Sequence, residues 1–205
     1  MLHVTCYMKL IVGLGNPGEK YKLNRHNVGF MFINYLLEVF KIKFESTSMS
    51  IQSPTFKTDK YLFSEIAQVG ASNSQSQQFI LAKPQTYMNK SGDAVKKTIL
   101  HYKLKPSQSL IIIHDDLDIP FGKFKIQMQG PKQHNGLTSV QNKLRTMEFL
   151  RVRIGVDSRP LENRIPGEEF VLQDFTEEER SALPELFKKI EIQFEPFLQS
   201  KNNCS

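Results

Sequence analysis

Residues 9–18 read KLIVGLGNPG, a short branched apolar run that ends in glycines and an Asn-Pro-Gly turn. Such a run predicts a buried strand. After a polar stretch, residues 28–40 (VGFMFINYLLEVF) place apolar side chains at helical spacing. Residues 110–113 (LIII) predict a second core strand. Strands that alternate with helices along the chain indicate an α/β protein.

The remaining elements follow from the same periodicities. Further strands are predicted at 61–69, 79–83, 123–128 and 151–156, and further helices at 92–102, at 137–144 and after Thr176. Ser91 is expected to cap the helix at 92–102. We therefore expect one domain over residues 8–198, with a central mixed, largely parallel twisted sheet flanked by helices. Residues 1–7 are interpreted as an extension before Met8, and residues 199–205 as a polar tail.

Charge is unevenly distributed along the 205 residues, which carry 27 Lys and Arg against 21 Asp and Glu. Residues 83–153 hold 13 basic and 5 acidic residues, whereas residues 154–205 hold 6 basic and 11 acidic ones. The basic middle predicts a polyanionic partner. Much of the acidic excess is explained by a helix that begins after Thr176, because acids in a first turn favour the helix dipole.

Cysteine usage and hydropathy exclude several classes of protein. The two cysteines, Cys6 and Cys204, are too few for a disulfide scaffold or a Cys-rich zinc site. No apolar run approaches the ~18 residues that would span a bilayer, and the first residues lack the features of a signal peptide. We expect a cytoplasmic protein with no membrane segment.

The glycines of residues 13–18 (GLGNPG) allow three interpretations. The spacing matches the G-x-G-x-x-G of dinucleotide-binding proteins, although Pro17 interrupts it and the helix begins only near Val28. A tight turn without a ligand is the second interpretation. In the third, the end of the strand places Asn16 in a cleft, because ligands gather at the carboxyl ends of strands in open α/β sheets.

Polar residues beside the predicted strands could carry chemistry. His26 precedes the first helix, and as a general base it would need a partner that fixes its tautomer. The segment 114–118 (HDDLD) could supply that partner, bind a divalent cation or be plainly solvated. Asn89 and Asn135, each near a helix start, are helix caps or donors to a carbonyl oxygen. No motif for a nucleophilic serine or cysteine is present, so water would be the nucleophile of any hydrolysis.

Four stretches together resemble bacterial-type peptidyl-tRNA hydrolases. They are residues 9–29 (KLIVGLGNPGEKYKLNRHNVG), 83–92 (KPQTYMNKSG), 111–126 (IIIHDDLDIPFGKFKI), and HNGL at 134–137 followed by LRVRIGV at 150–156. Each stretch alone is a weak signal, but the four in this order are highly specific. The resemblance extends from about Met8 to about Phe197.

The resemblance implies a fold, an activity and a set of site residues. Members of the family cleave the ester between an N-blocked amino acid or peptide and the 3′ end of tRNA, without a metal or organic cofactor and usually as monomers. By this resemblance His26 activates water, Asp115 orients His26, and Asn16 recognises the blocked substrate. The residues expected to bind the substrate or tRNA are Tyr21, Tyr87, Asn89, Asn135 and, as phosphate contacts, Lys125 and Arg153.

The chain departs from the family pattern at Lys132 and Gln133, which stand where glycines commonly precede the His-Asn-Gly motif. His134 of that motif is interpreted as part of the site architecture. Two rival functions remain at this point: an RNA-binding relative without hydrolytic activity, and a nucleotide-dependent oxidoreductase. The intact set of His26, Asp115 and the three asparagines favours the hydrolase.

Overall fold

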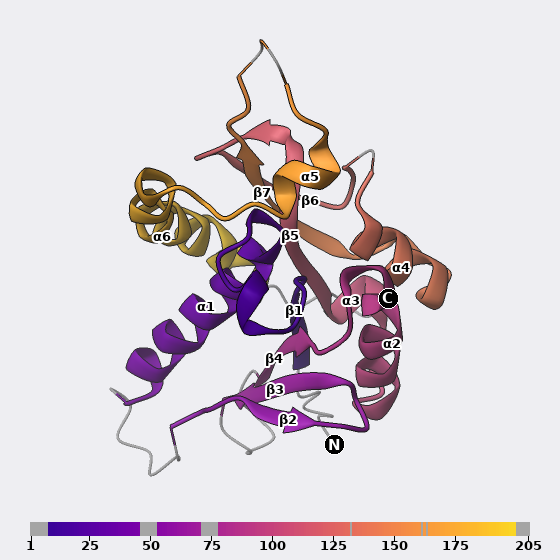
Figure 1. Cartoon of the computed structure of the whole chain (residues 1–205). Helices are drawn as coiled ribbons and strands as arrows, with labels where there is room; N and C mark the ends of the chain where they lie inside the picture. Colours follow the sequence, from indigo (N-terminus) through magenta and orange to yellow (C-terminus); the bar gives the residue numbers. More distant parts are fainter. Residues whose placement is uncertain are drawn as a thin grey trace, which may run out of the picture.

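The computed structural model describes residues 8–45, 53–70, 78–131, 133–160, 162 and 164–199. Within these residues, seven strands form one sheet in the order β2-β3-β4-β1-β5-β7-β6 (Figure 1). The strands are β1 (Met8–Gly13), β2 (Lys57–Asp59), β3 (Ser64–Val69), β4 (Gln78–Pro84), β5 (Leu110–Pro120), β6 (Phe124–Gln127) and β7 (Leu150–Asp157). The helices are α1 (Val28–Glu45), α2 (Ser91–His101), α3 (Pro106–Ser109), α4 (Asn135–Leu144), α5 (Gly167–Val171) and α6 (Glu177–Gln199), with 3-10 turns η1 (Glu19–Tyr21), η2 (Arg25–Asn27) and η3 (Met88–Lys90). The predicted α/β fold with a mixed sheet is confirmed.

The centre of the sheet is parallel and its borders are antiparallel. Strands β4, β1, β5 and β7 run in the same direction, while β2, β3 and β6 pair antiparallel with their neighbours. The carboxyl ends of the four parallel strands therefore meet at one edge. In open α/β sheets this edge is where ligands bind.

Each face of the sheet is covered by a different pair of helices (Figure 1). Because side chains alternate across a strand, Leu10 and Val12 of β1 pack with residues of α2 and α4. Ile11 points the other way and packs with residues of α1 and α6, as does Ile113 of β5. All four side chains are at most 1% exposed, so β1 lies at the centre of a three-layer core.

Helix α1 approaches the sheet so closely that backbone touches backbone. A Cβ on Gly29, in the first turn of α1, would lie 2.5 Å from the carbonyl oxygen of Leu14 and 2.6 Å from that of Ile113. Gly13 faces the backbone of Gly29, and Gly15 faces the ring of Phe30. These glycines serve helix packing. The dinucleotide-binding interpretation of GLGNPG requires a helix that begins in this loop, whereas a 3-10 turn follows it and α1 starts only at Val28.

Several element boundaries differ from the prediction for identifiable reasons. The strand predicted at 61–69 begins only at Ser64, because Asp59 accepts a hydrogen bond from the Leu62 amide (2.9 Å) and closes a turn. Strand β5 continues to Pro120, so the acidic segment 114–118 lies within the strand rather than beyond it. The predicted Ser91 cap is wrong. Ser91 is the first helical residue, and Ser139 of α4 accepts the hydrogen bond of the Gly92 amide instead (3.0 Å).

The predicted start of the last helix is confirmed in detail. The hydroxyl of Thr176 accepts a hydrogen bond from the Glu179 amide (3.2 Å), and the Glu179 carboxylate accepts one from the Thr176 amide (2.9 Å). This reciprocal pair is a capping box. The acids of the tail therefore belong to the start of a folded helix.

The predicted extension, residues 1–7, lies outside the described residues, as does the predicted tail apart from Gln199, which ends α6. No described helix has both the length and the apolar character needed to cross a membrane.

Replacing Gly29 with alanine should lower the free energy of unfolding by about 3 kcal/mol, because the new methyl group meets two backbone oxygens that cannot move aside. Alanine is otherwise the better helix former, so helix propensity alone predicts the opposite sign. Denaturant unfolding measures the difference. Gly122→Ala is the control: it has φ +80 but no atom within 4 Å, and should cost about 1 kcal/mol. A Gly29→Ala variant as stable as the wild type would contradict the close contact.

Candidate active site

His26 and Asp115 form a buried pair at the carboxyl edge of the sheet. His26 lies in η2, directly before α1, and Asp115 lies in β5, 89 residues later. The Nδ1 atom of His26 lies 2.8 Å from Oδ1 of Asp115, and the two residues are 8% and 2% exposed. A carboxylate accepts hydrogen bonds, so Nδ1 carries the proton. The neutral imidazole then has an unprotonated Nε2, as a general base requires.

A second histidine shares the same carboxylate oxygen. The Nε2 atom of His134 lies 3.0 Å from Oδ1 of Asp115. Its Nδ1 accepts a hydrogen bond from the Leu137 amide (3.2 Å) at the start of α4. Because a backbone N–H can only donate, Nδ1 of His134 is unprotonated and Nε2 donates to Asp115. The helix start thus fixes the tautomer of His134, and Asp115 joins both histidines.

The charges of this cluster are coupled. Burial alone would raise the pKa of Asp115, but the hydrogen bonds and charges of His26 and His134 hold that pKa well below its usual range. Burial likewise opposes protonation of His26, yet the charge and hydrogen bond of Asp115 outweigh it and raise the pKa of His26. At neutral pH the carboxylate is therefore ionised and adjacent to an imidazole of increased basicity.

His114 is a third histidine beside this pair, and it stays neutral. Its ring packs edge-on against His134, with 4.8 Å between ring centroids, and its Nδ1 lies 2.6 Å from the carbonyl oxygen of Asp115. Complete burial, with His134 nearby, holds the pKa of His114 well below its usual range. His114 therefore holds the Asp115 backbone in place and does not exchange protons with solvent.

Asn16 and Asn27 hold the loop after β1 against η2. The Asn16 amide donates to Oδ1 of Asn27, and Nδ2 of Asn27 donates to the Asn16 carbonyl oxygen, both at 2.9 Å. The side-chain Oδ1 of Asn16 accepts a hydrogen bond from the Met88 amide (2.8 Å), which fixes the orientation of that side chain. Only its Nδ2, a donor, is left for a ligand.

These residues line a cleft of about 610 Å³. The predicted residues on its wall are Asn16, His26, Tyr87, Asn89, Asp115 and Asn135. Tyr21 is not on the wall, but its ring packs edge-on against Tyr87 at 6.5 Å. Gln133, one of the two residues at which the chain departs from the family pattern, also lines the cleft. The other, Lys132, lies outside the described residues. The structure thus brings together residues from four separate stretches of sequence.

The predicted phosphate contacts lie apart from this wall and differ from each other. Lys125 of β6 and Arg153 of β7 are opposite partners in the antiparallel pair. Lys125 is exposed, but Arg153 is only 6% exposed and its Nε lies 2.5 Å from the Asp116 carboxylate. Part of the Arg153 guanidinium is thus already paired with a buried acid, and its contact with a phosphate stays a prediction.

The acidic segment 114–118 does not converge on a cation. Asp115 and Asp116 are neighbours in β5 and point to opposite faces of the sheet, toward His26 and Arg153 respectively. Among the described residues, His26, Asp115 and His134 are the group whose spacing could hold a metal ion, with ligand atoms within 4.8 Å of one another. Both ring nitrogens that face Asp115 carry protons, so a metal would have to displace two hydrogen bonds.

Sequence reasoning missed three contributors to the site. Residues 166–168, 171 and 172, in and around α5, form one wall of the cleft, but α5 has only five residues and no clear periodicity. Asn27 was not assigned, although it adjoins His26. The third is Arg25, whose basic side chain gave no sign of burial.

Arg25 anchors the segment that carries His26. Its guanidinium donates to the Asp174 carbonyl oxygen (2.7 Å) and pairs with Glu179 of α6 (2.6 Å). It also stacks on the ring of Phe170 in α5, 4.1 Å from the centroid. Ser158 donates to the other oxygen of Glu179 (2.5 Å). The residue next to His26 is thus tied to both C-terminal helices.

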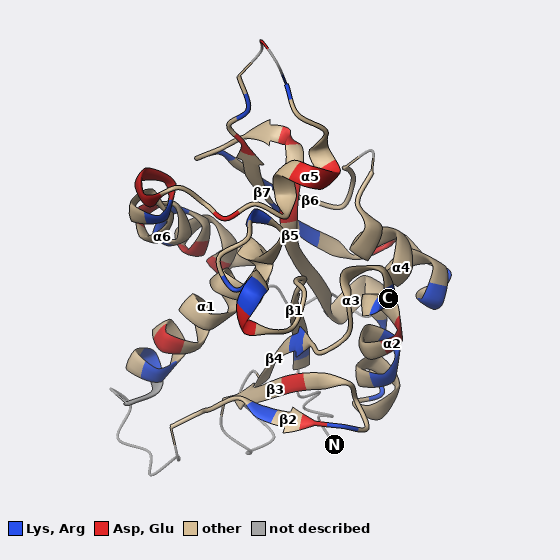
Figure 2. Ribbon diagram, viewed as in Figure 1, with Lys and Arg blue, Asp and Glu red and all other residues tan. Residues whose placement is uncertain are grey.

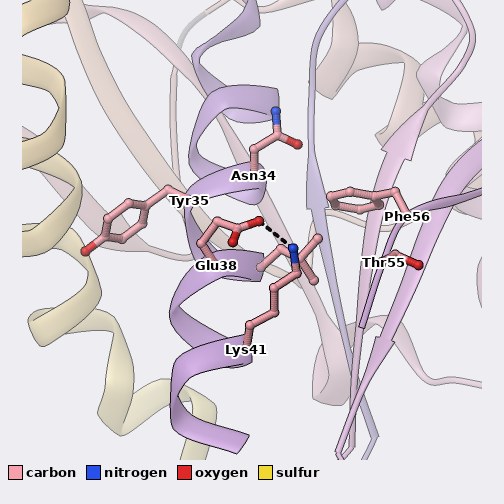
Figure 3. A pocket seen from close by; sticks show the side chains of 7 residues that line it. Asn34, Tyr35, Glu38, Lys41, Thr55 and Phe56 are labelled. Carbon is pink, nitrogen blue, oxygen red and sulfur yellow. Dashed lines mark hydrogen bonds and ion pairs between the residues drawn. The ribbon is translucent and has the colours of Figure 1, made fainter. Parts of the chain in front are cut away.

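A second cavity, of about 500 Å³, lies between α1 and the segment that precedes β2 (Figure 3). Its wall includes Leu37, Phe56 and the ion pair of Glu38 with Lys41 (2.7 Å). None of the predicted site residues lines it, so it is separate from the candidate active site.

Known proteins with the same sequence pattern and fold are peptidyl-tRNA hydrolases. The family model described as "Peptidyl-tRNA hydrolase" matches residues 10–204. A peptidyl-tRNA hydrolase of Chloroflexus aurantiacus is 39% identical over 184 residues, which cover 89% of this chain and 88% of the relative. One from Bacillus thuringiensis is 39% identical and covers 95% and 98%. The crystal structure of the Acinetobacter baumannii peptidyl-tRNA hydrolase superposes with a TM-score of 0.73 at 27% identity, covering 95% and 93%.

Replacing Glu179 with alanine should lower the free energy of unfolding by about 3–5 kcal/mol, because it leaves the Arg25 guanidinium buried without its anion. Glu177→Ala is the matched control on the same turn. That acid is 88% exposed and 3.6 Å from Arg180, so its loss should cost about 1 kcal/mol or less. Chemical denaturation compares the two variants, and equal losses would contradict the anchoring role of Arg25.

Proposed function

The chain belongs to the peptidyl-tRNA hydrolase family and is a carboxylic ester hydrolase, and from this premise we propose that His26, oriented by Asp115, activates the water that cleaves the ester. The substrate is an N-blocked amino acid or peptide esterified to the 3′ end of tRNA. The observation that carries the proposal is the 2.8 Å contact between His26 Nδ1 and Asp115 Oδ1 at the wall of the cleft.

The reaction needs one base and no covalent intermediate on the protein. Nε2 of His26 removes a proton from water as the water oxygen bonds to the ester carbonyl carbon. The resulting tetrahedral oxyanion collapses, the bond to the ribose oxygen breaks, and the imidazolium returns its proton to that oxygen. Such base assistance is typically worth about 10²–10⁴-fold. Asp115 favours the useful tautomer and stabilises the imidazolium.

Neutral amides hold the peptide part of the substrate. Asn16 offers only its Nδ2 donor, which suits the carbonyl oxygen of an N-blocking group and repels the N–H donors of a free ammonium group. Asn89 and Asn135 have exposed side chains on the same cleft and would bind the ester carbonyl or the oxyanion. A well-aimed donor contributes about 10²–10³-fold. Tyr21 and Tyr87 provide aromatic surface at the entrance.

Binding of tRNA depends on cations outside the cleft. Lys125 is exposed and can contact a phosphate. Arg153 also acts indirectly, because it neutralises the buried carboxylate of Asp116. Phosphate contacts give affinity without reading the base sequence, which suits an enzyme that acts on many tRNAs. The family resemblance implies that the protein acts as a monomer.

Purified protein should cleave N-acetyl-aminoacyl-tRNA in the presence of a chelator, and should cleave the unblocked aminoacyl-tRNA at least about 10-fold more slowly. The reason for the preference is that the ammonium group presents donors to the Nδ2 donor of Asn16. Release of labelled amino acid measures both rates. Binding of the blocked tRNA without cleavage would instead identify an RNA-binding relative.

The pH dependence of kcat/KM should report the titration of His26. Its neutral form is the base, so activity should rise with pH along a limb centred above the ordinary histidine pKa of about 6.5. In Asp115→Asn the charge that raises the pKa of His26 is gone. That variant should lose about 10²–10⁴-fold in kcat/KM, and its limb should move to lower pH.

Two further variants make this test specific. Asp93→Asn removes a surface acid that pairs with Lys143, and should leave both rate and limb unchanged. His26→Ala should abolish turnover while the affinity for tRNA is retained. An unmoved limb in Asp115→Asn, or a large loss of tRNA affinity in His26→Ala, would contradict the assigned roles.

A further inference from the structure

Two exposed aromatic rings stand on the turn between β2 and β3, outside the cleft. Tyr61 is 71% exposed and Phe63 is 42% exposed, while Leu62 between them is 1% exposed and packs into the core below α2. The buried leucine and the hydrogen bond from its amide to Asp59 fix the turn. The two rings are therefore held outward by a rigid anchor.

Phe63 has an unfavourable backbone conformation. Its φ is +53, in the left-handed region that favours glycine, and a bulky side chain is an outlier there. Strained residues of this kind cluster at functional sites. The exposed ring contributes little to the core, so folding stability does not explain its presence.

One lysine contacts both rings and donates a hydrogen bond to the Tyr61 carbonyl oxygen (3.0 Å). Nζ of Lys97, on α2, lies 3.7 Å from the ring centroid of Phe63 and 4.9 Å from that of Tyr61. Exposed lysines lie on β2, on the turn and on α2 (Figure 2); they are Lys57, Lys60 and Lys96. Within the described part of the chain none of these three has an ion-pair partner. Of the nearby acids, Asp59 accepts the Leu62 amide, Glu65 pairs with Lys83, and Asp93 pairs with Lys143.

This surface adjoins the entrance of the cleft. The carbonyl oxygen of Phe63 accepts a hydrogen bond from the Gln85 amide (2.7 Å). Tyr87, which is 58% exposed and lines the cleft, follows two residues later. Two residues of extended chain span at most about 7 Å. The rings of the turn and the ring of Tyr87 are therefore within reach of a short stretch of one polymer.

We propose that Tyr61, Phe63 and Lys97 form a stacking platform for the single-stranded nucleotides that precede the 3′-terminal residue of the tRNA. Aromatic rings interleaved with lysines are how proteins bind single-stranded nucleic acid without reading sequence. The unpaired lysines favour phosphates over a peptide of variable charge. The inference rests on the proposed function, because it places the terminal nucleotide at His26 and the preceding ones beyond Tyr87.

Phe63→Gly is the decisive variant. It removes the ring and at the same time suits φ +53, so it should fold with an unchanged or higher melting temperature. With N-acetyl-aminoacyl-tRNA it should raise KM by about 5- to 10-fold and leave kcat unchanged. With N-acetyl-aminoacyl-adenosine, which lacks the preceding nucleotides, kcat/KM should equal that of the wild type. Ile192→Ala, at a 62% exposed apolar position of α6, should alter neither substrate.

Binding of a fluorescent single-stranded RNA with the tRNA 3′-terminal sequence gives an independent measurement. Lys97→Gln should weaken this binding and reduce the slope of log Kd against log salt by about 0.7, whereas Lys188→Gln on α6 should not. Unchanged KM and slope would overturn the platform alone, and an equal KM increase for both esters would assign the rings to the peptide. A wild type that cleaves neither ester would overturn the proposed function and this inference with it.

Discussion

The backbone contact between α1 and β1 is the constraint on which the site depends. Gly29 can lie against the carbonyl oxygens of Leu14 and Ile113 only because it has no side chain. This contact sets the distance of α1 from the sheet, and η2 directly precedes α1. This packing therefore brings His26 to Asp115, where the two form their 2.8 Å contact. Asn16 and Asn27 then join the two backbone segments that this packing brings together.

Most groups on the wall of the cleft are neutral, and the positive charges lie outside the cleft. Inside the cleft, one carboxylate oxygen is shared by two imidazole N–H groups, and the other polar groups on its wall are mostly neutral amides. The cations lie outside, where solvent reduces the cost of their charge and where a polyanion can reach them. Arg25 and Arg153 are buried exceptions, and their charges are balanced by Glu179 and Asp116. A substrate with a neutral ester and a charged polymer on one side of it matches this arrangement.

Local sequence patterns predicted the strands and helices whose periodicity is contained in one segment. The apolar runs at 9–14, 28–40 and 110–113 correspond to β1, α1 and β5, because strand and helix periodicities are visible within one segment. The pair of His26 and Asp115 was also predicted, through the family resemblance, and the geometry agrees. Contacts that depend on distant partners were not predicted. Ser139 replaces the Ser91 cap, and Asp116 occupies the guanidinium of Arg153. The burial of Arg25 depends on Glu179, 154 residues away, so no local pattern could indicate it.

That long separation also sets an order of assembly. During synthesis Arg25 is added 154 residues before Glu179. Until α6 is complete, the strand and helix that carry Asp115 and His26 can exist while the guanidinium beside them has no buried anion. An enzyme of this family is itself made as a peptide ester of tRNA. The surroundings of His26 therefore reach their final structure only after Glu179 has been added to the growing peptidyl-tRNA.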